Sequence, residues 1–342
     1  MYLKCSALEK AQEVFEQLPV RNVVSWSAMI NGYVQHGLCE EALNLYKRMR
    51  EDDLKPDSVT FSCVLRACGN IGAMRKGEEI HAEAHRNGML ERHSFLGSAL
   101  VDMYAKCGSI ALAQQMFDKI LVQDTVSWTA IIRGYYEHES FDDTLQFFEQ
   151  MLMEGVVPSV AIFVCSMKAC GRIGATVKGQ IIHTLIESQG LLERDPVVGS
   201  TLVSMYAACD SLSKAEEAFG KLPVRDKVSW TALIEGYNDQ GHLEEALKFF
   251  EQMHVEGIFP DALTFTCIIK SCIGNSNKGH MMLVKISEHG LLKGNLSLCN
   301  TLVKIYLKYR LFSEAHQVFG KISVRDIILW STLIAGYTEH GL

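Results

Sequence analysis

His81 and Glu83 have the His-x-Glu spacing of zinc-dependent nucleobase deaminases, in which the histidine ligates the metal and the glutamate transfers protons. That signature also requires Pro-Cys-x-x-Cys, and the chain contains no Cys-x-x-Cys. In later copies of the internal repeat described below, the position of His81 holds His183 and then Leu283. Because a leucine cannot ligate zinc, we predict a packing position here, and no catalytic residue, metal site or cofactor.

The eleven cysteines are a second candidate for chemistry, either as metal ligands or as disulfides. Most of them recur at fixed positions of the repeat: Cys63, Cys165 and Cys267; Cys68, Cys170 and Cys272; Cys5, Cys107 and Cys209. Cys63 and Cys68 lie five residues apart, and so do the equivalent pairs in the later copies. This spacing differs from that of common zinc sites. Recurrence of this kind is typical of small core residues, so we predict buried, free cysteines in a reduced intracellular protein.

A glycine cluster is the third candidate. Gly69, Gly72 and Gly77 form neither the GxGxxG pattern nor the Gly-Lys-Ser/Thr pattern of a phosphate-binding loop. The cluster recurs 102 residues later as Gly171, Gly174 and Gly179. We predict that these glycines mark the turns of helical hairpins, and we expect no small-molecule substrate.

All these recurrences come from a pattern that repeats every 102 residues. The segment Ser25–Tyr33 reads SWSAMINGY, Ser127–Tyr135 reads SWTAIIRGY and Ser229–Tyr237 reads SWTALIEGY. A fourth copy, LWSTLIAGY at Leu329–Tyr337, follows 100 residues after the third. Self-similarity at a fixed period is the signature of a solenoid, in which stacked units share one continuous core.

Each full period divides into three related units of 36, 31 and 35 residues when the expected helix starts are taken as boundaries, and the first unit of the third copy has 34 residues. The chain is then a single array over residues 1–342, with partial units at both ends. The ranges are 1–22 (partial), 23–57, 58–93, 94–124, 125–159, 160–195, 196–226, 227–261, 262–295, 296–326 and 327–342 (partial).

Each unit has the pattern of two helices joined by a tight turn. In the unit 23–57, Trp26, Ile30 and Tyr33 are spaced i, i+4, i+7, and a second apolar set follows after Gly37. Such spacing places one apolar stripe on a helix. The fold class predicted from these patterns is therefore all-α, an α-solenoid of helix-turn-helix repeats.

The net charge and the distribution of apolar residues indicate which kinds of partner to expect. The net charge of -7 and the pI near 6.0 have the wrong sign for tight, nonspecific binding to phosphates, although a basic groove can lie on an acidic body. No stretch approaches 18 uncharged apolar residues, so we expect no membrane partner. No targeting peptide is visible, and both ends fall inside a repeat unit, so both ends look truncated.

The 35-residue units, with Ser-Trp-x-x-x-Ile-x-Gly-Tyr and a closing Pro-Asp, resemble pentatricopeptide repeats. The alternation of unit lengths resembles the plant PLS subclass, whose Leu-Val-x-Met-Tyr-Ala-x-Cys pattern occurs at Leu100–Cys107 and Leu202–Cys209. The resemblance implies a right-handed superhelix that binds single-stranded RNA in a mitochondrion or chloroplast, usually to specify sites of cytidine-to-uridine editing. It also implies that editing factors or a deaminase act as partners in trans.

In this family, base choice resembles a code of one base per unit, read by the fifth and the last residue. The implied RNA base-binding pairs are Ser27 with Asp57, Ser62 with His93, Ser98 with Asp124, Thr129 with Ser159, Val164 with Asp195, Ser200 with Asp226, Thr231 with Asp261, Thr266 with Asn295, and Asn300 with Asp326. By the same resemblance, Ser or Thr with Asp favours guanine, Thr with Asn favours adenine, and Asn with Asp favours uracil. The 36-residue units follow the code poorly, since Val164 cannot form hydrogen bonds and His93 is atypical.

Several structural alternatives stay open at these positions. An aspartate that precedes a helix is also an N-cap, and one carboxylate can fulfil both roles. A fifth residue can be a small residue on the helix surface, so Thr231→Asn should barely affect folding while it shifts base preference. The four tryptophans could stack on bases, but their place on the apolar stripe favours core packing. They are Trp26, Trp128, Trp230 and Trp330.

The rival function is a helical scaffold of tetratricopeptide type that binds peptides or proteins. The three unequal units and the polar fifth and last residues favour RNA, whereas the acidic net charge favours the scaffold. We therefore expect a non-enzymatic α-solenoid that binds single-stranded RNA, with the peptide- or protein-binding scaffold as the alternative.

Overall fold

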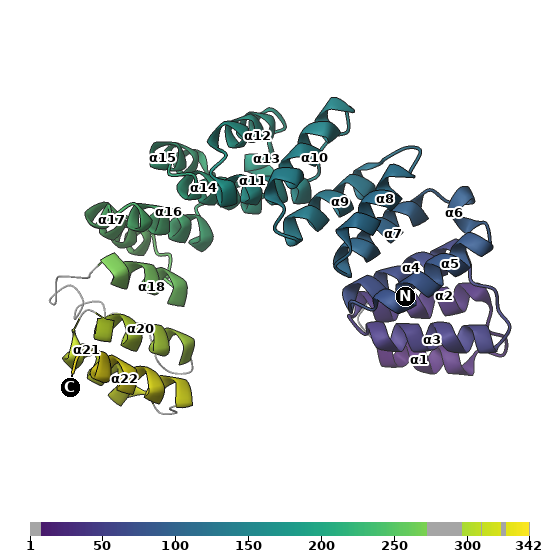
Figure 1. The fold of residues 1–342 in the computed structure, drawn as a ribbon, viewed down its shortest axis with the longest axis horizontal. Coiled ribbons are helices and arrows are strands. Elements are labelled where there is room, and N and C mark those ends of the chain that lie inside the picture. The colour runs from purple at the N-terminus through teal and green to yellow at the C-terminus, as the bar shows by residue number, and fades with distance from the viewer. Residues whose placement is uncertain (1–7, 272–295, 309, 323–325, 342) are drawn as a thin grey trace. The chain divides into compact units, whose positions relative to one another are not determined.

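The computed structural model describes residues 8–271, 296–308, 310–322 and 326–341, and every regular element in these ranges is an α-helix (Figure 1). The all-α class predicted from the sequence is confirmed. None of these helices combines the length and the apolar composition that crossing a lipid bilayer requires. Contacts divide the chain into two compact parts, Met1–Ala169 and Cys170–Leu342.

The first part is a series of helical hairpins. Its helices are α1 (Leu8–Gln17), α2 (Val23–Gln35), α3 (Cys39–Glu51), α4 (Ser58–Asn70), α5 (Met74–Arg86), α6 (Met89–Arg92), α7 (Phe95–Lys106), α8 (Ile110–Asp118), α9 (Thr125–Glu137) and α10 (Phe141–Met153). The helices α2, α4, α7 and α9 pack on one another in sequence, and we call them first helices. The helices α3, α5, α8 and α10 each pack on the first helix of their own hairpin, and we call them second helices.

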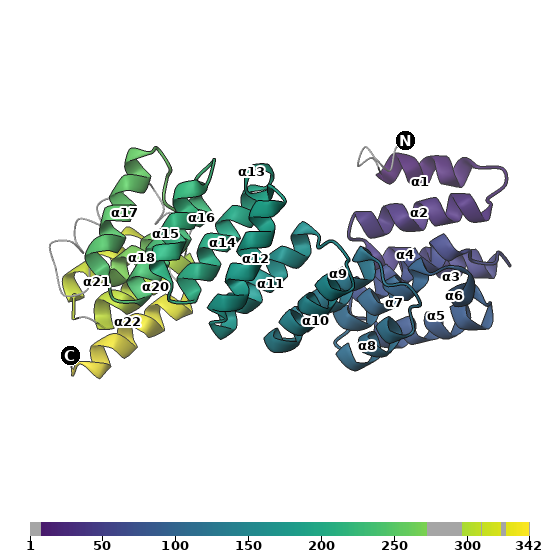
Figure 2. The ribbon, with the colours of Figure 1, turned by 90° about the horizontal axis from the view of Figure 1, so that it is seen from above.

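The second part has the same construction. Helix α11 (Val160–Ile173) extends across the boundary between the parts and is followed by α12 (Thr176–Ser188), α13 (Leu191–Arg194), α14 (Pro196–Ala208), α15 (Leu212–Lys221), α16 (Lys227–Asp239), α17 (Leu243–Val255), α18 (Ala262–Ser271), α20 (Leu296–Lys308), α21 (Phe312–Lys321) and α22 (Ile327–Glu339). The first helices α14 and α16 lie side by side, as both views show (Figures 1 and 2). Each part is thus a stack of helical hairpins, as an α-solenoid requires.

A buried tryptophan lies at the centre of three hairpins. Each of the three has 0% of its surface exposed, and each ring packs edge-to-face on a phenylalanine of the helix that precedes its hairpin. The pairs are Trp26 with Phe15, Trp128 with Phe117 and Trp230 with Phe219, with ring centroids 4.8, 4.7 and 4.6 Å apart. Edge-to-face pairs are stabilised beyond the area that they bury. The prediction of core packing is confirmed for these three residues.

Trp330 differs, and the core prediction is wrong for it, because 47% of its surface is exposed. Its ring still packs on Phe319, with centroids 4.6 Å apart. In an earlier copy the second helix of the same hairpin covers the ring, as Phe147 of α10 does for Trp128 at 6.2 Å. α22 is the last of the described helices, so no described residue stands in the place of Phe147.

Consecutive first helices approach closely at the glycine of the Gly-Tyr motif. A Cβ added at Gly134 would lie 2.8 Å from the Cβ of Ala105, and one at Gly236 would lie 2.7 Å from that of Ala207. Both distances are shorter than real side chains tolerate. The missing side chain at this position therefore sets the spacing of α7 from α9 and of α14 from α16.

The glycines expected to mark turns fall into two groups. Gly72 and Gly174 do lie in turns, each with φ of +67°. Gly69 and Gly77 lie inside α4 and α5, and a Cβ at Gly77 would come within 2.5 Å of the Met103 sulfur. The turn prediction is wrong for this second group, since these glycines serve close packing rather than an unusual backbone conformation.

The described cysteines are core residues. All nine of them are free thiols, and seven are buried. Burial raises the pKa of Cys68 to about 12, so this thiol is protonated and unreactive at neutral pH. The prediction of small, buried, free cysteines is therefore confirmed at these seven positions, while Cys107 and Cys165 are half-buried.

We expect Gly236→Ala to destabilise the fold by about 1–3 kcal/mol, because the new methyl group overlaps Ala207 and forces the two first helices apart. The matched control is Gly220→Ala in α15, where an added Cβ meets nothing within 4 Å. This control should be neutral or stabilising by up to about 1 kcal/mol, through helix propensity. Urea unfolding followed by circular dichroism measures both free energies, and equal midpoints would contradict the close-approach argument.

Candidate nucleic-acid interface

The last residue of most expected units is the N-cap of the next first helix. At each described aspartate in this position, a carboxylate oxygen accepts a hydrogen bond of 2.7–3.0 Å from a backbone N–H two or three residues later. The donors are Thr60 for Asp57, Ser127 for Asp124, Val197 for Asp195, Ser229 for Asp226, Thr264 for Asp261 and Leu329 for Asp326. Ser159 forms a weaker cap, with its hydroxyl 3.4 Å from the N–H of Ile162.

In three units the fifth residue lies within hydrogen-bonding distance of the last residue. The oxygen atoms are 3.3 Å apart for Ser27 and Asp57, 3.4 Å for Ser98 and Asp124, and 3.4 Å for Thr129 and Ser159. The fifth residue lies one turn inside its first helix, and the last residue begins the adjacent first helix. Two residues about 30 positions apart in the chain therefore form one small polar site between neighbouring helices.

In two units a threonine at the third position of the following unit contacts both the fifth and the last residue. The hydroxyls of Thr231 and Thr264 lie 2.7 Å apart, and Thr264 in turn donates to Asp261 at 2.9 Å. The same arrangement joins Ser27, Thr60 and Asp57. Sequence reasoning missed these threonines. Their signal is a threonine three residues after a capping aspartate.

Three expected pairs are not joined by a hydrogen bond between the described side chains. They are Ser62 with His93, Ser200 with Asp226, and Asn300 with Asp326. Of these, His93 packs its ring near Phe95 at 5.7 Å, and Ser200 donates to the carbonyl of Pro196 at 3.1 Å. The amide oxygen of Asn300 is buried and has no hydrogen-bond partner among the described residues. Asn295, the expected partner of Thr266, lies outside the described residues, and Val164 offers no polar atom.

Four of the fifth residues are buried rather than on the helix surface. Ser27, Ser98, Ser200 and Thr231 are each only 5% exposed. The expectation that Thr231 lies on the helix surface is therefore wrong, because the adjacent first helix, which begins with the Thr264 segment, covers it. Replacing this threonine would disturb packing as well as any ligand.

Several fifth-residue hydroxyls already donate inside their own helices. Ser27 donates to the carbonyl of Val23 at 2.8 Å, and Thr129 donates to that of Thr125 at 2.6 Å. A hydroxyl whose hydrogen is engaged offers only its lone pairs to a ligand. Since the neighbouring carboxylates are also acceptors, sites such as Ser27 with Asp57 present hydrogen-bond acceptors.

Two successive sites open into one groove of the first part. The groove encloses about 580 Å³ and is lined by Ser62, Ser98, Asp124, Thr129 and Ser159. These residues come from three successive first helices and their caps. Besides Asp124, the charged residues of the same groove are Arg66, Asp102, Lys106 and Arg133.

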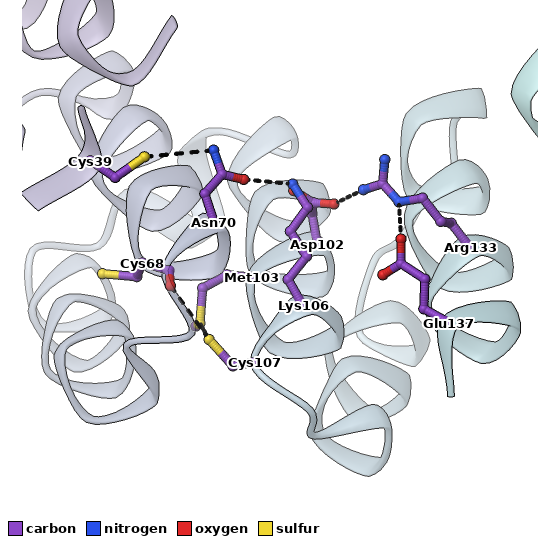
Figure 3. A network of polar contacts seen from close by, with 9 residues as sticks. All are labelled: Cys39, Cys68, Asn70, Asp102, Met103, Lys106, Cys107, Arg133 and Glu137. Atoms are coloured by element: carbon purple, nitrogen blue, oxygen red, sulfur yellow. Dashed lines mark hydrogen bonds and ion pairs between the residues drawn. The ribbon is translucent and has the colours of Figure 1, made fainter. Parts of the chain in front are cut away.

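Three of these charged residues, Asp102, Lys106 and Arg133, belong to a network that extends over α4, α7 and α9 (Figure 3). One carboxylate oxygen of Asp102 lies 2.9 Å from the ammonium nitrogen of Lys106, and the other contacts the guanidinium group of Arg133. Lys106 also donates to Asn70 at 3.0 Å, and Arg133 lies 3.7 Å from Glu137. Sequence reasoning missed this network, although Asp102 and Arg133 each follow a fifth residue by four positions, one helical turn.

The His-x-Glu segment has a packing role, as predicted. A ring nitrogen of His81 lies 2.8 Å from the hydroxyl of Tyr104, and burial lowers the pKa of this histidine. Glu83 accepts hydrogen bonds from Tyr46 at 3.1 Å and Arg50 at 3.0 Å. In the described ranges, no three His, Cys, Asp or Glu side chains lie close enough together to hold a metal ion.

Comparison with known families agrees with the stacked hairpins. The profile of the PPR repeat family matches residues 21–70 and 225–274, and the profile of the PPR repeat matches residues 59–89, 126–156 and 297–327. The repeated two-helix unit and these matches define the class, and the chain belongs to the pentatricopeptide repeat family.

Individual relatives come from Arabidopsis thaliana. A chloroplastic pentatricopeptide repeat-containing protein is 35% identical over 342 residues, which are 100% of this chain and 42% of the relative. A mitochondrial one is 33% identical over 344 residues, covering 100% of this chain and 33% of the relative. The chain thus spans less than half the length of these two relatives.

Solved structures show the same fold. The pentatricopeptide repeat protein PPR10 in complex with an 18-nucleotide psaJ RNA element superposes with a TM-score of 0.74 at 17% identity, covering 100% of this chain and 52% of that chain. PPR10 from maize superposes with a TM-score of 0.62 at 17% identity, covering 99% of this chain and 55% of that chain. At this identity the likeness concerns the fold.

We expect Trp128→Ala to destabilise the fold by about 3–5 kcal/mol, as truncation of a large buried aromatic residue does. The side chain is fully buried against Phe117, so it has no face available for stacking on a base. Thermal melting followed by circular dichroism measures the loss. An unchanged melting temperature would show that this tryptophan is not the core residue described above.

Proposed function

We propose that this chain binds single-stranded RNA through its fifth and last residues, one base per unit, over the array of units from residue 23 to residue 326. The array acts as a scaffold without catalysis of its own. It specifies sites of organellar RNA processing, and we propose cytidine-to-uridine editing by a deaminase or editing factors in trans, as in the PLS subclass.

The groove of the first part is the observation on which this proposal depends. Two consecutive polar sites, Ser98 with Asp124 and Thr129 with Ser159, line one open groove. The same kind of polar site recurs on successive first helices. Such a series fits a polymer that presents one equivalent group per monomer. Only unpaired bases expose the Watson–Crick edges that such sites can bind, so the polymer is single-stranded.

The hydrogen-bonding character of the sites supports a preference for guanine. A fifth hydroxyl that donates within its helix, next to a capping carboxylate, presents acceptors alone. The Watson–Crick edge of guanine offers N–H donors at N1 and N2, whereas adenine and uracil offer fewer. Ser27 with Asp57 shows both features. We extend the same preference, by the family resemblance, to Ser98 with Asp124, Ser200 with Asp226, and Thr231 with Asp261.

The comparisons support the ligand and the compartment at the level of the family. One similar structure is a complex of PPR10 with RNA, and relatives are named chloroplastic or mitochondrial. We therefore propose that the protein acts on RNA in one of these organelles. The net charge of -7 indicates that base contacts, rather than nonspecific attraction to phosphates, provide much of the affinity.

We expect the protein to bind a single-stranded RNA, with guanine opposite the Ser/Thr–Asp pairs, more tightly than the duplex of the same sequence. The physical reason is that base pairing occupies the donors at N1 and N2 of guanine. Fluorescence anisotropy with both forms, at one salt concentration, measures the ratio of dissociation constants. Equal affinities would contradict base reading and favour the rival peptide-binding scaffold.

We expect Asp261→Asn to shift the preference at one RNA position from guanine to adenine, by about 1–3 kcal/mol of discrimination. The Asn amide can donate to N1 of adenine, and its oxygen can still cap Thr264, so folding should be preserved. Affinities for RNAs that differ only at that base measure the change.

Asp226→Asn is the matched control, because Asp226 caps the preceding first helix in the same way. It should move the preference at the neighbouring nucleotide and leave the first position unchanged. If both variants alter the same nucleotide, or if neither alters any, the capping residues do not read bases.

A further inference from the structure

Charged side chains lie one helical turn beyond the fifth residues on the wall of the groove in the first part. Arg66 of α4, Asp102 of α7 and Arg133 of α9 each follow a fifth residue by four positions. Lys106 follows one turn further along α7. All four line the same groove as the polar sites. The groove lining therefore contains three cations but only two carboxylates, those of Asp102 and Asp124.

One carboxylate engages two of these cations. The Oδ2 of Asp102 lies 2.9 Å from the Nζ of Lys106, while its Oδ1 contacts the guanidinium of Arg133 (Figure 3). The three side chains are 21%, 25% and 35% exposed, so water and ligands can reach them. Arg66 is exposed and forms no ion pair with any described residue.

A purely structural role explains this network poorly. Ion pairs that water can reach add little stability, because the attraction is screened and two long side chains must be ordered. The residues that correspond to Asp102, Lys106 and Arg133 in the next period are Ser204, Ala208 and Glu235. The first helices α14 and α16 still pack on each other there, with these different residues at the three positions. The stacking of first helices therefore does not require it.

We propose that Lys106 and Arg133, with Arg66 on the same wall, form a binding site for one phosphate of the RNA backbone, which the Asp102 carboxylate occupies in the free protein. A carboxylate and a phosphate diester are both anionic oxygen acceptors that pair with guanidinium and ammonium groups. The proposal rests on the proposed function, since it takes the same RNA in the same groove.

The position of the site fits a backbone that passes the polar sites. Lys106 and Arg133 lie one or two turns along the helices that present Ser98 and Thr129. A base held at those residues leaves its own phosphate near the groove wall. To bind there, the phosphate displaces Asp102 from the cations and stays close to its negative charge. Asp102 is thus an internal competitor that weakens binding, and it does so for every sequence, because a phosphate contact contains no base information.

The test compares Asp102→Asn with the matched control Asp142→Asn, which makes the same change of charge in the first turn of α10, outside the groove. Fluorescence anisotropy measures the affinity for two single-stranded RNAs of equal length. One has guanine opposite the Ser/Thr–Asp pairs, and the other contains uridine alone. We expect Asp102→Asn to raise the affinity for both RNAs about fivefold, as removal of one charge at contact distance does. Asp142→Asn should change the affinity less than about twofold, because its charge is remote and screened.

Two further variants test the phosphate contact and the competing carboxylate separately. Arg133→Gln should weaken binding and reduce the slope of log affinity against log salt by about 0.7, the value for one phosphate contact of a single strand. Asp102→Ser copies the residue present at Ser204, so it should repeat the gain if the asparagine variant folds poorly, with melting temperature as the check on folding.

The outcomes separate the two proposals. If the wild type binds neither RNA, the proposed function fails, and the phosphate site fails with it. If the wild type binds but Asp102→Asn gains no more than Asp142→Asn, or if Arg133→Gln leaves the salt slope unchanged, only the phosphate site is overturned. A gain confined to the guanine-containing RNA would also overturn it, since it would show an effect on base reading.

Discussion

Capping of the first helices is the interaction on which the rest of this structure depends. The first N–H groups of any helix lack partners within the helix, and a side-chain oxygen such as that of Asp124 supplies one. Loss of such a cap typically costs about 1 kcal/mol. Because the cap also ends the preceding unit, its carboxylate lies between two first helices and beside a fifth-residue hydroxyl, as in the pair of Ser98 and Asp124. Backbone hydrogen bonding therefore fixes the polar sites in place.

Local patterns in the sequence predicted the parts of the fold that depend on local physics. Helix periodicity, capping aspartates and the burial of Trp26, Trp128 and Trp230 all follow from spacing within one unit. The errors arose where a residue of another unit decides the outcome. Gly77 makes room for Met103, and the exposure of Trp330 depends on residues outside its own helix. Neither fact is encoded in the residues that flank the position.

In the candidate site, too, some features could be predicted from the sequence, and others depend on contacts between units. The resemblance to a known family identified which positions to pair, and the structure brings Ser27, Ser98 and Thr129 to their partners. The network of Asp102, Lys106 and Arg133 could not be predicted, because it depends on the register between α7 and α9. Likewise, the net charge of -7 does not predict the charge of a single groove, and in this groove cations outnumber carboxylates. Local potentials are set by such arrangements rather than by the total charge.

The capping position has a consequence for how such a chain can change over evolutionary time. Asn22, Asp57 and Ser159 all cap first helices, so three residue types with different hydrogen-bonding groups satisfy the same backbone requirement. A single substitution at this position can replace one of these residue types by another, and the helix still begins at the same place. Under the proposed function, a lineage could therefore change its RNA target through folded intermediates, and selection on target choice would be separated from selection on stability.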